Sequence, residues 1–260
     1  MPLNIRTYRD LTEPDASGLP AQIGAQRHRV AARLARVGRV VAVMSGKGGV
    51  GKSFVTAHLA RAVARGGRAV GVLDADLNGP TAAGLLDAGR AALVVEEDAV
   101  LPATGADGVR LVSMDLLLED GRPLAFRGPA ADRFVWRGAL EAAALREFLA
   151  DVAWGSLDLL LVDLPPGLSR FEELADLLDR PPAVLTVTIP TPESRDAVRR
   201  ALRAAMERGA TPLGVVENMM GDQFRGDAAE VLAREFGVPV LARVPFHPPV
   251  GVWETLAARL

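Results

Sequence analysis

The sequence predicts an α/β fold: a doubly wound, mostly parallel sheet of about seven strands with helices on both faces. Three observations support this prediction. Short apolar runs alternate with longer stretches of helical periodicity along most of the chain. The run at 157–164, LDLLLVDL, is largely apolar instead of alternating, which is typical of a strand buried on both faces. A glycine-rich segment at 46–51 lies where an apolar run passes directly into a helical stretch.

We expect strands at the apolar and β-branched runs. Their ranges are 40–44, 69–74, 109–113, 157–164, 183–189, 213–217 and 240–244. Helices are expected where apolar residues recur every three or four positions. Their ranges are 52–65, 81–86, 139–152, 172–178, 192–208 and 227–236, with a short terminal helix over 252–259. The stretch 88–108 is the least regular, so it is expected to be either a hairpin or a flexible insert.

The composition excludes several classes of function. The chain has 260 residues, 49% of them hydrophobic and 24% charged, which is typical of a soluble globular protein. A net charge of -2 gives no reason to expect nucleic acid as a partner. A membrane partner is not expected either, because no apolar run approaches the ~20 residues that span a bilayer. The N-terminus lacks the apolar core of a signal peptide, so we expect a cytoplasmic location.

The segment 46–53, GKGGVGKS, matches the phosphate-binding pattern G-x-x-x-x-G-K-[ST] in full. Its glycines let the backbone turn tightly and aim N–H groups at a phosphate, next to the positive end of a helix. Lys52 is placed to reach the β- and γ-phosphates, and the Ser53 hydroxyl to ligate Mg²⁺. We therefore predict binding of ATP with Mg²⁺, followed by hydrolysis. The loop residues expected at the nucleotide are Gly46, Lys47, Gly48, Gly49, Val50, Gly51, Lys52, Ser53 and Phe54.

Acidic residues close two of the predicted strands: Asp74 and Asp76 follow one, and Asp163 ends another. Ligands of open α/β sheets bind outside the carboxyl ends of the strands, so these side chains are expected at the nucleotide. Asp163 suits the role of holding Mg²⁺ through water, and Asp74 is a further candidate metal ligand. Asp76 is a candidate catalytic residue that orients the attacking water, beside Lys47 and Lys52. For each Asp, a turn or helix cap is the alternative.

The chain is predicted to divide into an N-terminal part, 1–37, and a P-loop ATPase domain, 38–260. The N-terminal part reads as a leader followed by a basic amphipathic helix, in which apolar residues recur at helical spacing among arginines. The helix either packs on the core with its arginines in solvent, or contacts an acidic partner or lipid.

A series of motifs resembles the Mrp, or ApbC-like, family of P-loop ATPases, which is related to MinD and ParA. They are MSGKGGVGKS at 44–53, LDADLNGPT at 73–81, SMDLLLED at 113–120, WRGAL at 136–140, LDLLLVDLPPG at 157–167, GVVENM at 214–219 and GVPVLARVPFHP at 237–248. The resemblance covers roughly residues 38–248. It implies a homodimer that works with ATP in the assembly or delivery of iron–sulfur clusters.

The resemblance also implies roles for single residues. Lys47, the additional lysine of the loop, would reach across a dimer interface to the partner's nucleotide. Asn218 would read the adenine edge, with Pro245 and His247 lining the base. The alternatives are a solvated loop lysine and a turn asparagine. The resemblance assigns no role to Trp136 and Arg137 of the WRG motif.

The sequence departs from the family pattern at three places. Family members that carry clusters have a CxxC after the ENM motif, but Met219 and Met220 stand there, and the chain contains no cysteine at all. No iron–sulfur cluster ligated by this chain's own cysteines is therefore expected. The residues after VDLPPG are Leu-Ser-Arg at 168–170 instead of the family's Thr-Gly-Asp, and Phe54 replaces a hydroxyl residue. These two changes are expected to affect hydrolysis more than binding.

Three functions follow as expectations. The first is a dimeric Mrp-like ATPase, either a homodimer or a heteromer with a cysteine-bearing relative. The second is a nucleotide-switched positioning protein like MinD or ParA. The third is a regulatory module that holds ATP without turnover.

Overall fold

The computed structural model describes residues 19–77, 79–88, 93–96, 99–116, 144–222 and 224–260. The helices are α1 (Leu19–Leu34), α2 (Lys52–Arg65), α3 (Ala82–Leu85), α5 (Ser169–Leu177), α6 (Pro192–Glu207), α7 (Ala228–Phe236) and α8 (Val250–Ala257), and residues 144–150 are also helical. The strands are β1 (Val40–Ser45), β2 (Val70–Asp74), β3 (Val94–Val95), β4 (Val100–Leu101), β5 (Ala103–Thr104), β6 (Arg110–Val112), β7 (Leu159–Asp163), β8 (Ala183–Thr188), β9 (Thr211–Met220) and β10 (Val240–Pro245).

Within the described residues, the main sheet has eight strands in the order β10-β9-β8-β1-β7-β2-β6-β5. All neighbours pair in parallel except β5, which runs antiparallel to β6. The predicted count of about seven was one short, because β5 has two residues and leaves no readable pattern in the sequence. In the irregular stretch 88–108, β3 and β4 pair as the hairpin that was one of its two expected forms.

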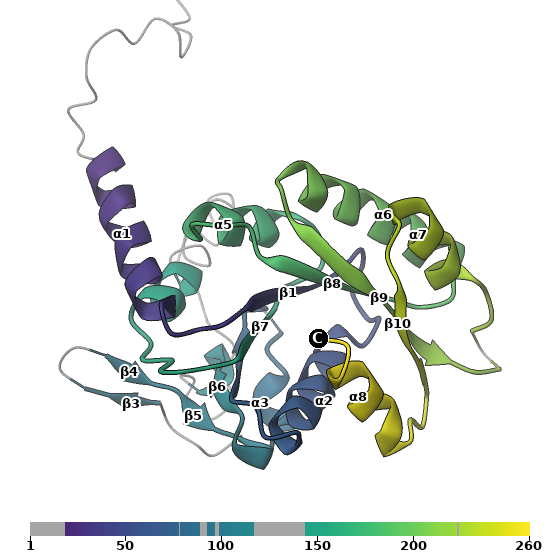
Figure 1. Ribbon diagram of the computed structural model, residues 1–260, viewed down its shortest axis with the longest axis horizontal. Helices are drawn as coiled ribbons and strands as arrows, with labels where there is room; N and C mark the ends of the chain where they lie inside the picture. Colours follow the sequence, from purple (N-terminus) through teal and green to yellow (C-terminus); the bar gives the residue numbers. More distant parts are fainter. Residues whose placement is uncertain (1–18, 78, 89–92, 97–98, 117–143, 223) are drawn as a thin grey trace, which may run out of the picture.

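The central strands β1, β2, β7 and β8 are largely apolar because each contributes side chains to two cores. Along β1, Val41 and Val43 belong to the core beneath α2, α3 and α8, whereas Ala42 and Met44 belong to the core beneath α1 and α5. Figure 1 shows α5, α6 and α7 on one side of the sheet and α2 and α8 on the other. The doubly wound α/β fold that the sequence predicts is confirmed.

Two element boundaries differ from the sequence prediction for identifiable reasons. β9 begins at Thr211, two residues before the predicted start. Pro212, which has no N–H to donate, lies within it next to a shift in the register with β8. α5 begins at Ser169, three residues earlier than predicted, so the segment after VDLPPG passes at once into a helix. Arg170 is buried there and pairs with Glu173.

Helix α1 is attached to the body by its C-terminal half and otherwise projects from it (Figure 1). Val30 and Leu34 are buried in the core, and the Arg33 Nε donates to the Ala150 carbonyl at 3.1 Å. The basic helix therefore packs on the core, which is one of its two expected roles, and its contact with an acidic partner or lipid stays a prediction. The predicted leader before it, the WRG residues Trp136 and Arg137 and the first residues of the helix predicted over 139–152 lie outside the described residues. In the described parts of the chain, no helix is sufficiently long and apolar to traverse a membrane.

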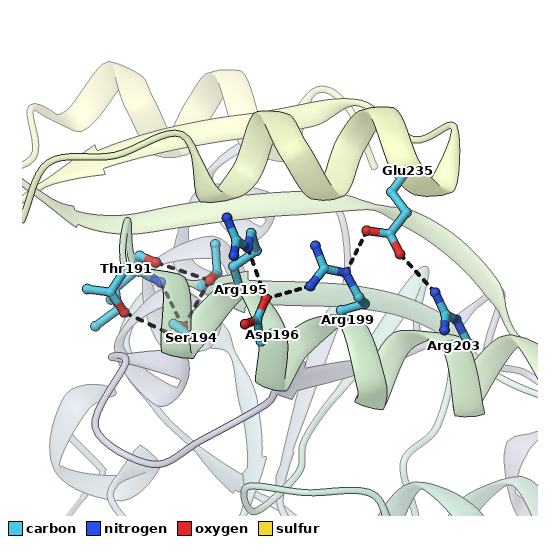
Figure 2. A network of polar contacts seen from close by, with 9 residues as sticks. Thr191, Ser194, Arg195, Asp196, Arg199, Arg203 and Glu235 are labelled. Atoms are coloured by element: carbon cyan, nitrogen blue, oxygen red, sulfur yellow. Dashed lines mark hydrogen bonds and ion pairs between the residues drawn. The ribbon is translucent and has the colours of Figure 1, made fainter.

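Ion pairs join α6 to α7 along one side of the molecule (Figure 2). The Asp196 carboxylate pairs with Arg195 and Arg199, and the Glu235 carboxylate of α7 pairs with Arg199 and Arg203. These side chains are all at least partly exposed to solvent, so each pair is worth little by itself. The apolar residues beneath them carry most of the stability of this face.

We expect the two layers of this face to respond differently to substitution. Leu202→Ala, on the buried side of α6, removes a packed side chain and lowers the free energy of unfolding by about 2–5 kcal/mol. Glu235→Gln, which removes the bridge between Arg199 and Arg203, lowers it by less than about 1 kcal/mol. Urea unfolding of both variants checks this, and an equal loss in the two would contradict it.

Candidate nucleotide-binding site

The predicted phosphate loop lies at the carboxyl end of β1, in the middle of the sheet. β1 pairs with β8 on one side and with β7 on the other, and the loop leads directly into α2. The strand order reverses at this point, which is where open α/β sheets bind ligands. The N-terminus of α2, with its unpaired N–H groups, faces the same space.

Local geometry explains why the loop is rich in glycine. Gly49 and Gly51 have φ of 77° and 76°, a left-handed conformation that side chains disfavour. A Cβ at Gly46 would lie 2.2 Å from the backbone carbon of Ala197 on α6, so no larger residue fits there. Glycine is therefore required at 49 and 51 by the backbone conformation and at 46 by packing against α6.

A buried ion pair forms the floor of the site. The Lys52 Nζ lies 2.5 Å from the Asp163 Oδ1, and both side chains are almost completely buried. The Thr56 hydroxyl lies 3.1 Å from the same oxygen. The Asp163 Oδ2 is buried and has no hydrogen-bond partner within the described residues. Buried carboxylate oxygens are normally satisfied, so this atom is suited to a cation or to the water molecules around one.

Asp74 lies beside Asp163 on the neighbouring strand, in direct register. Its Oδ2 accepts hydrogen bonds from the backbone N–H groups of Thr81 and Ala82, each at 3.0 Å. The Ser113 hydroxyl donates to the same oxygen at 3.3 Å, and the Oδ1 accepts from the Asp76 N–H. Burial, with the nearby charge of Asp163, raises the pKa of Asp74 to about 7. Asp74 thus joins the end of β2 to the start of α3, and both its oxygens already have donors.

The remaining predicted residues border this floor. Lys47 and Ser53 are half-buried on the loop, and the Lys47 carbonyl accepts a hydrogen bond from the Ser45 hydroxyl at 3.0 Å. Asp76 is half-buried just beyond β2. No group of three or more His, Cys, Asp or Glu side chains that could hold a metal occurs in the part of the chain that the structure describes. Mg²⁺ fits such a site, because it keeps several waters and takes ligands from the bound phosphates.

The residues expected at the base lie at the ends of β9 and β10. The Asn218 Nδ2 donates to the carbonyl of Val50 in the loop at 2.9 Å, and Pro245 pairs with Met220. His247 is exposed and borders a cavity of about 650 Å³ between α2 and α8. Adenine recognition by these residues stays a prediction.

An aromatic cluster lines the same cavity. The Phe54 ring packs against His58 and Trp253, with ring centroids 4.2 and 5.6 Å away, and the His58 and Trp253 rings are stacked. Burial and the positive charges of Arg61 and Arg65 lower the pKa of His58. The side chain that replaces the family's hydroxyl residue therefore links α2 to α8.

The sequence reasoning missed Thr56 and Ser113, which bond to the two buried carboxylates. Thr56 stands four residues after Lys52, on the same face of α2, so helical spacing could have revealed it. Ser113 follows β6, and only the order of strands in the sheet brings it to Asp74.

Comparison with known proteins gives concordant matches. The family model described as NUBPL iron-transfer P-loop NTPase matches residues 36–255. The iron-sulfur cluster carrier protein of Saccharolobus solfataricus is 35% identical over 241 residues, 88% of this chain and 78% of that protein. The cytosolic Fe-S cluster assembly factor CFD1 of Chaetomium globosum is 38% identical over 242 residues, 83% of this chain and 76% of that protein. Among solved structures, the nucleotide-binding protein from Archaeoglobus fulgidus in complex with ADP matches with a TM-score of 0.71 and 30% identity, covering 90% of this chain and 92% of its own.

The close contact at Gly46 yields a prediction with a matched control. Gly46→Ala forces a methyl group into the backbone of α6 and lowers the free energy of unfolding by about 1–3 kcal/mol. Gly251→Ala, within α8 and with no described atom within 4 Å of the added methyl, is neutral or stabilising by up to about 1 kcal/mol. Thermal and urea unfolding measure both, and the expectation fails if the two substitutions shift stability in the same direction.

Proposed function

The chain belongs to the Mrp- and NUBPL-related family of iron-transfer P-loop NTPases, and from this premise we propose that it binds ATP with Mg²⁺ and hydrolyses it. The observation that carries the proposal is the buried pair of Lys52 and Asp163 at the phosphate loop, with one carboxylate oxygen that has no donor among the residues that the structure describes. Burying two charges is costly, and such a pair beside a phosphate loop is a candidate site for a charged ligand.

In the proposed cycle the residues of the site exchange partners. Without nucleotide, Lys52 neutralises Asp163. When a triphosphate occupies the loop, the ammonium group of Lys52 turns to the β- and γ-phosphates and leaves the carboxylate of Asp163 free, and Asp163 would then help to hold Mg²⁺. Ser53 supplies a hydroxyl ligand to Mg²⁺, which when bound neutralises negative charge on the phosphates. Asp76, half-buried at the end of β2, positions the attacking water.

We further propose that two copies of the chain close on the nucleotide, with Lys47 reaching the nucleotide of the partner. The position of Lys47 on the phosphate loop, directly after Gly46, supports this.

The chain's place in iron–sulfur metabolism is proposed from its relatives, named as a cluster carrier and a cluster assembly factor. The chain has no cysteine, so a cluster bridged by thiolates does not fit it. A heteromer with a cysteine-bearing relative, in the cytoplasm, would reconcile the family role with this sequence.

A second candidate function is a module that holds ATP without turnover. The observation in its favour is the early start of α5. The segment after VDLPPG, where the sequence departs from the family pattern, is helical from Ser169 and anchored by the buried Arg170. A segment fixed in this way can be slow to rearrange. Measuring ATP turnover separates the two functions.

Substitutions at the buried pair test ATP binding and its dependence on magnesium. Lys52→Ala weakens ATP binding about 10- to 100-fold, because charge-assisted hydrogen bonds to phosphate are lost. Asp163→Asn retains binding of magnesium-free ATP but loses the increase in affinity on adding Mg²⁺, together with turnover. Asp158→Asn, at the opposite end of the same strand region, is the control and leaves both unchanged. Titration calorimetry with and without Mg²⁺ measures these affinities, and an unaltered magnesium effect in Asp163→Asn would refute the assignment.

The dimer proposal is tested by light scattering after size exclusion. With ATP and Mg²⁺ the wild type doubles in mass, while Lys47→Ala binds ATP and stays monomeric. ADP is the control nucleotide, because a lysine that senses the γ-phosphate gives little dimer with it. A wild type that binds ATP and remains monomeric would contradict the cross-dimer role and favour the ATP-holding module.

A further inference from the structure

We propose that Asn218 is a positioning residue for the phosphate loop: its side-chain amide holds the loop in shape before any nucleotide arrives. The inference deepens the proposed function and rests on it only in taking residues 46–53 as the phosphate site. It differs from recognition of the base, because the contact involves the loop itself and needs no ligand.

The first observation is the contact between Asn218 and the loop. The Asn218 Nδ2 donates to the carbonyl oxygen of Val50 at 2.9 Å, and only 2% of the residue is exposed. A loop made largely of glycine has few side chains that could stabilise a single conformation. A buried donor on its carbonyl therefore supplies a restraint that the loop cannot provide.

The second observation is how closely the amide approaches the loop. A Cβ on Gly51 would lie 2.3 Å from the Asn218 Nδ2, and the same Gly51 has a φ of 76°. Glycine at this position thus serves both the turn of the loop and the approach of the amide. The methyl carbon of Met219 reaches the same glycine, lying 3.3 Å from the position of that Cβ.

The third observation concerns the contacts of the strand that carries Asn218. The neighbouring Glu217 is fully buried, and its Oε1 accepts the N–H of Ala229 at the start of α7. Its other oxygen lies 3.7 Å from the Nε of Arg243 on β10. Because side chains alternate along a strand, Glu217 fixes β9 from the opposite face while Asn218 reaches the loop. Met219, next along β9, has a left-handed φ of 59° and lies beside a shift in the register between β9 and β10.

The Asn218 amide could have two different functions, reading adenine or positioning the loop, and the two predict different effects of substitution. A residue that only reads adenine affects nucleotides with a base and leaves the empty loop unchanged. A residue that positions the loop affects the empty loop, and equally any ligand that is bound by phosphate alone. Loop order that is established before binding raises affinity by reducing the entropy lost on binding.

The first experiment is hydrogen–deuterium exchange on the full chain without nucleotide, followed on peptides that cover residues 46–56. Asn218→Ala speeds exchange in these peptides about tenfold, because the Val50 carbonyl loses its donor. Asn218→Leu has a side chain of similar size without a donor, and it has the same effect if the hydrogen bond is responsible. His247→Ala, at an exposed residue that the resemblance places at the base, is the matched control and leaves the loop peptides unchanged.

The second experiment compares binding of Mg·ATP and of magnesium tripolyphosphate, which has no base or sugar. Asn218→Ala weakens both by a similar factor of about ten, whereas His247→Ala affects ATP alone. Unchanged exchange of the loop in Asn218→Ala, or loss of ATP binding with unchanged tripolyphosphate binding, overturns the inference. A wild type that binds neither ligand overturns the proposed function, and the exchange experiment still decides the role of Asn218.

Discussion

The contact between the Lys52 ammonium and the Asp163 carboxylate is the constraint around which this molecule is organised. It exists because β1, β7 and β2 are adjacent and parallel, so that the residues ending each strand meet at one edge. Val43 and Asp74 both lie in register with Asp163, and α2 brings Lys52 over them. Two charges removed from water need close partners, and here each charge is the partner of the other, with a further hydrogen bond from the Thr56 hydroxyl to Asp163. The contact between Lys52 and Asp163 therefore forms only when the sheet order, the strand register and the direction of α2 are all as described.

Close packing around the site also explains two of the glycines of the loop. At Gly46 the backbone passes against α6, and at Gly51 it passes against the amide of Asn218. Elsewhere the glycine at 49 allows a left-handed turn with open space beside it. The pattern GKGGVGKS thus combines two kinds of requirement, one that comes from phosphate chemistry and one that comes from neighbours distant in the sequence.

Much of this arrangement could be predicted from the sequence, since both strand burial and the phosphate-loop pattern are local signals. Periodicity located α2 to the residue and gave the parallel sheet, and the carboxyl-end rule placed Asp74 and Asp163 near Lys52. Prediction failed where local signals were weak or misleading: β5 is too short to show a pattern, and Pro212 hides the first residues of β9. The bonds from Ser113 and Asn218 depend on how distant segments pack, which one sequence does not reveal, whereas Thr56 was readable from its position four residues after Lys52 on α2.

The loop is also part of a closed chain of contacts. Its first glycine presses on α6, and α6 is tied to α7 through Arg199 and Glu235. The N-terminus of α7 is held by Glu217, and the residue after Glu217 returns to the loop at Val50. These contacts therefore form a closed circuit that runs from the loop through α6, α7 and β9 and back to the loop. Close packing at Gly46 and the buried hydrogen bond at Val50 restrain the loop, whereas the partly exposed pair of Arg199 and Glu235 adds little, so movement of the loop is limited mainly by α6 and β9.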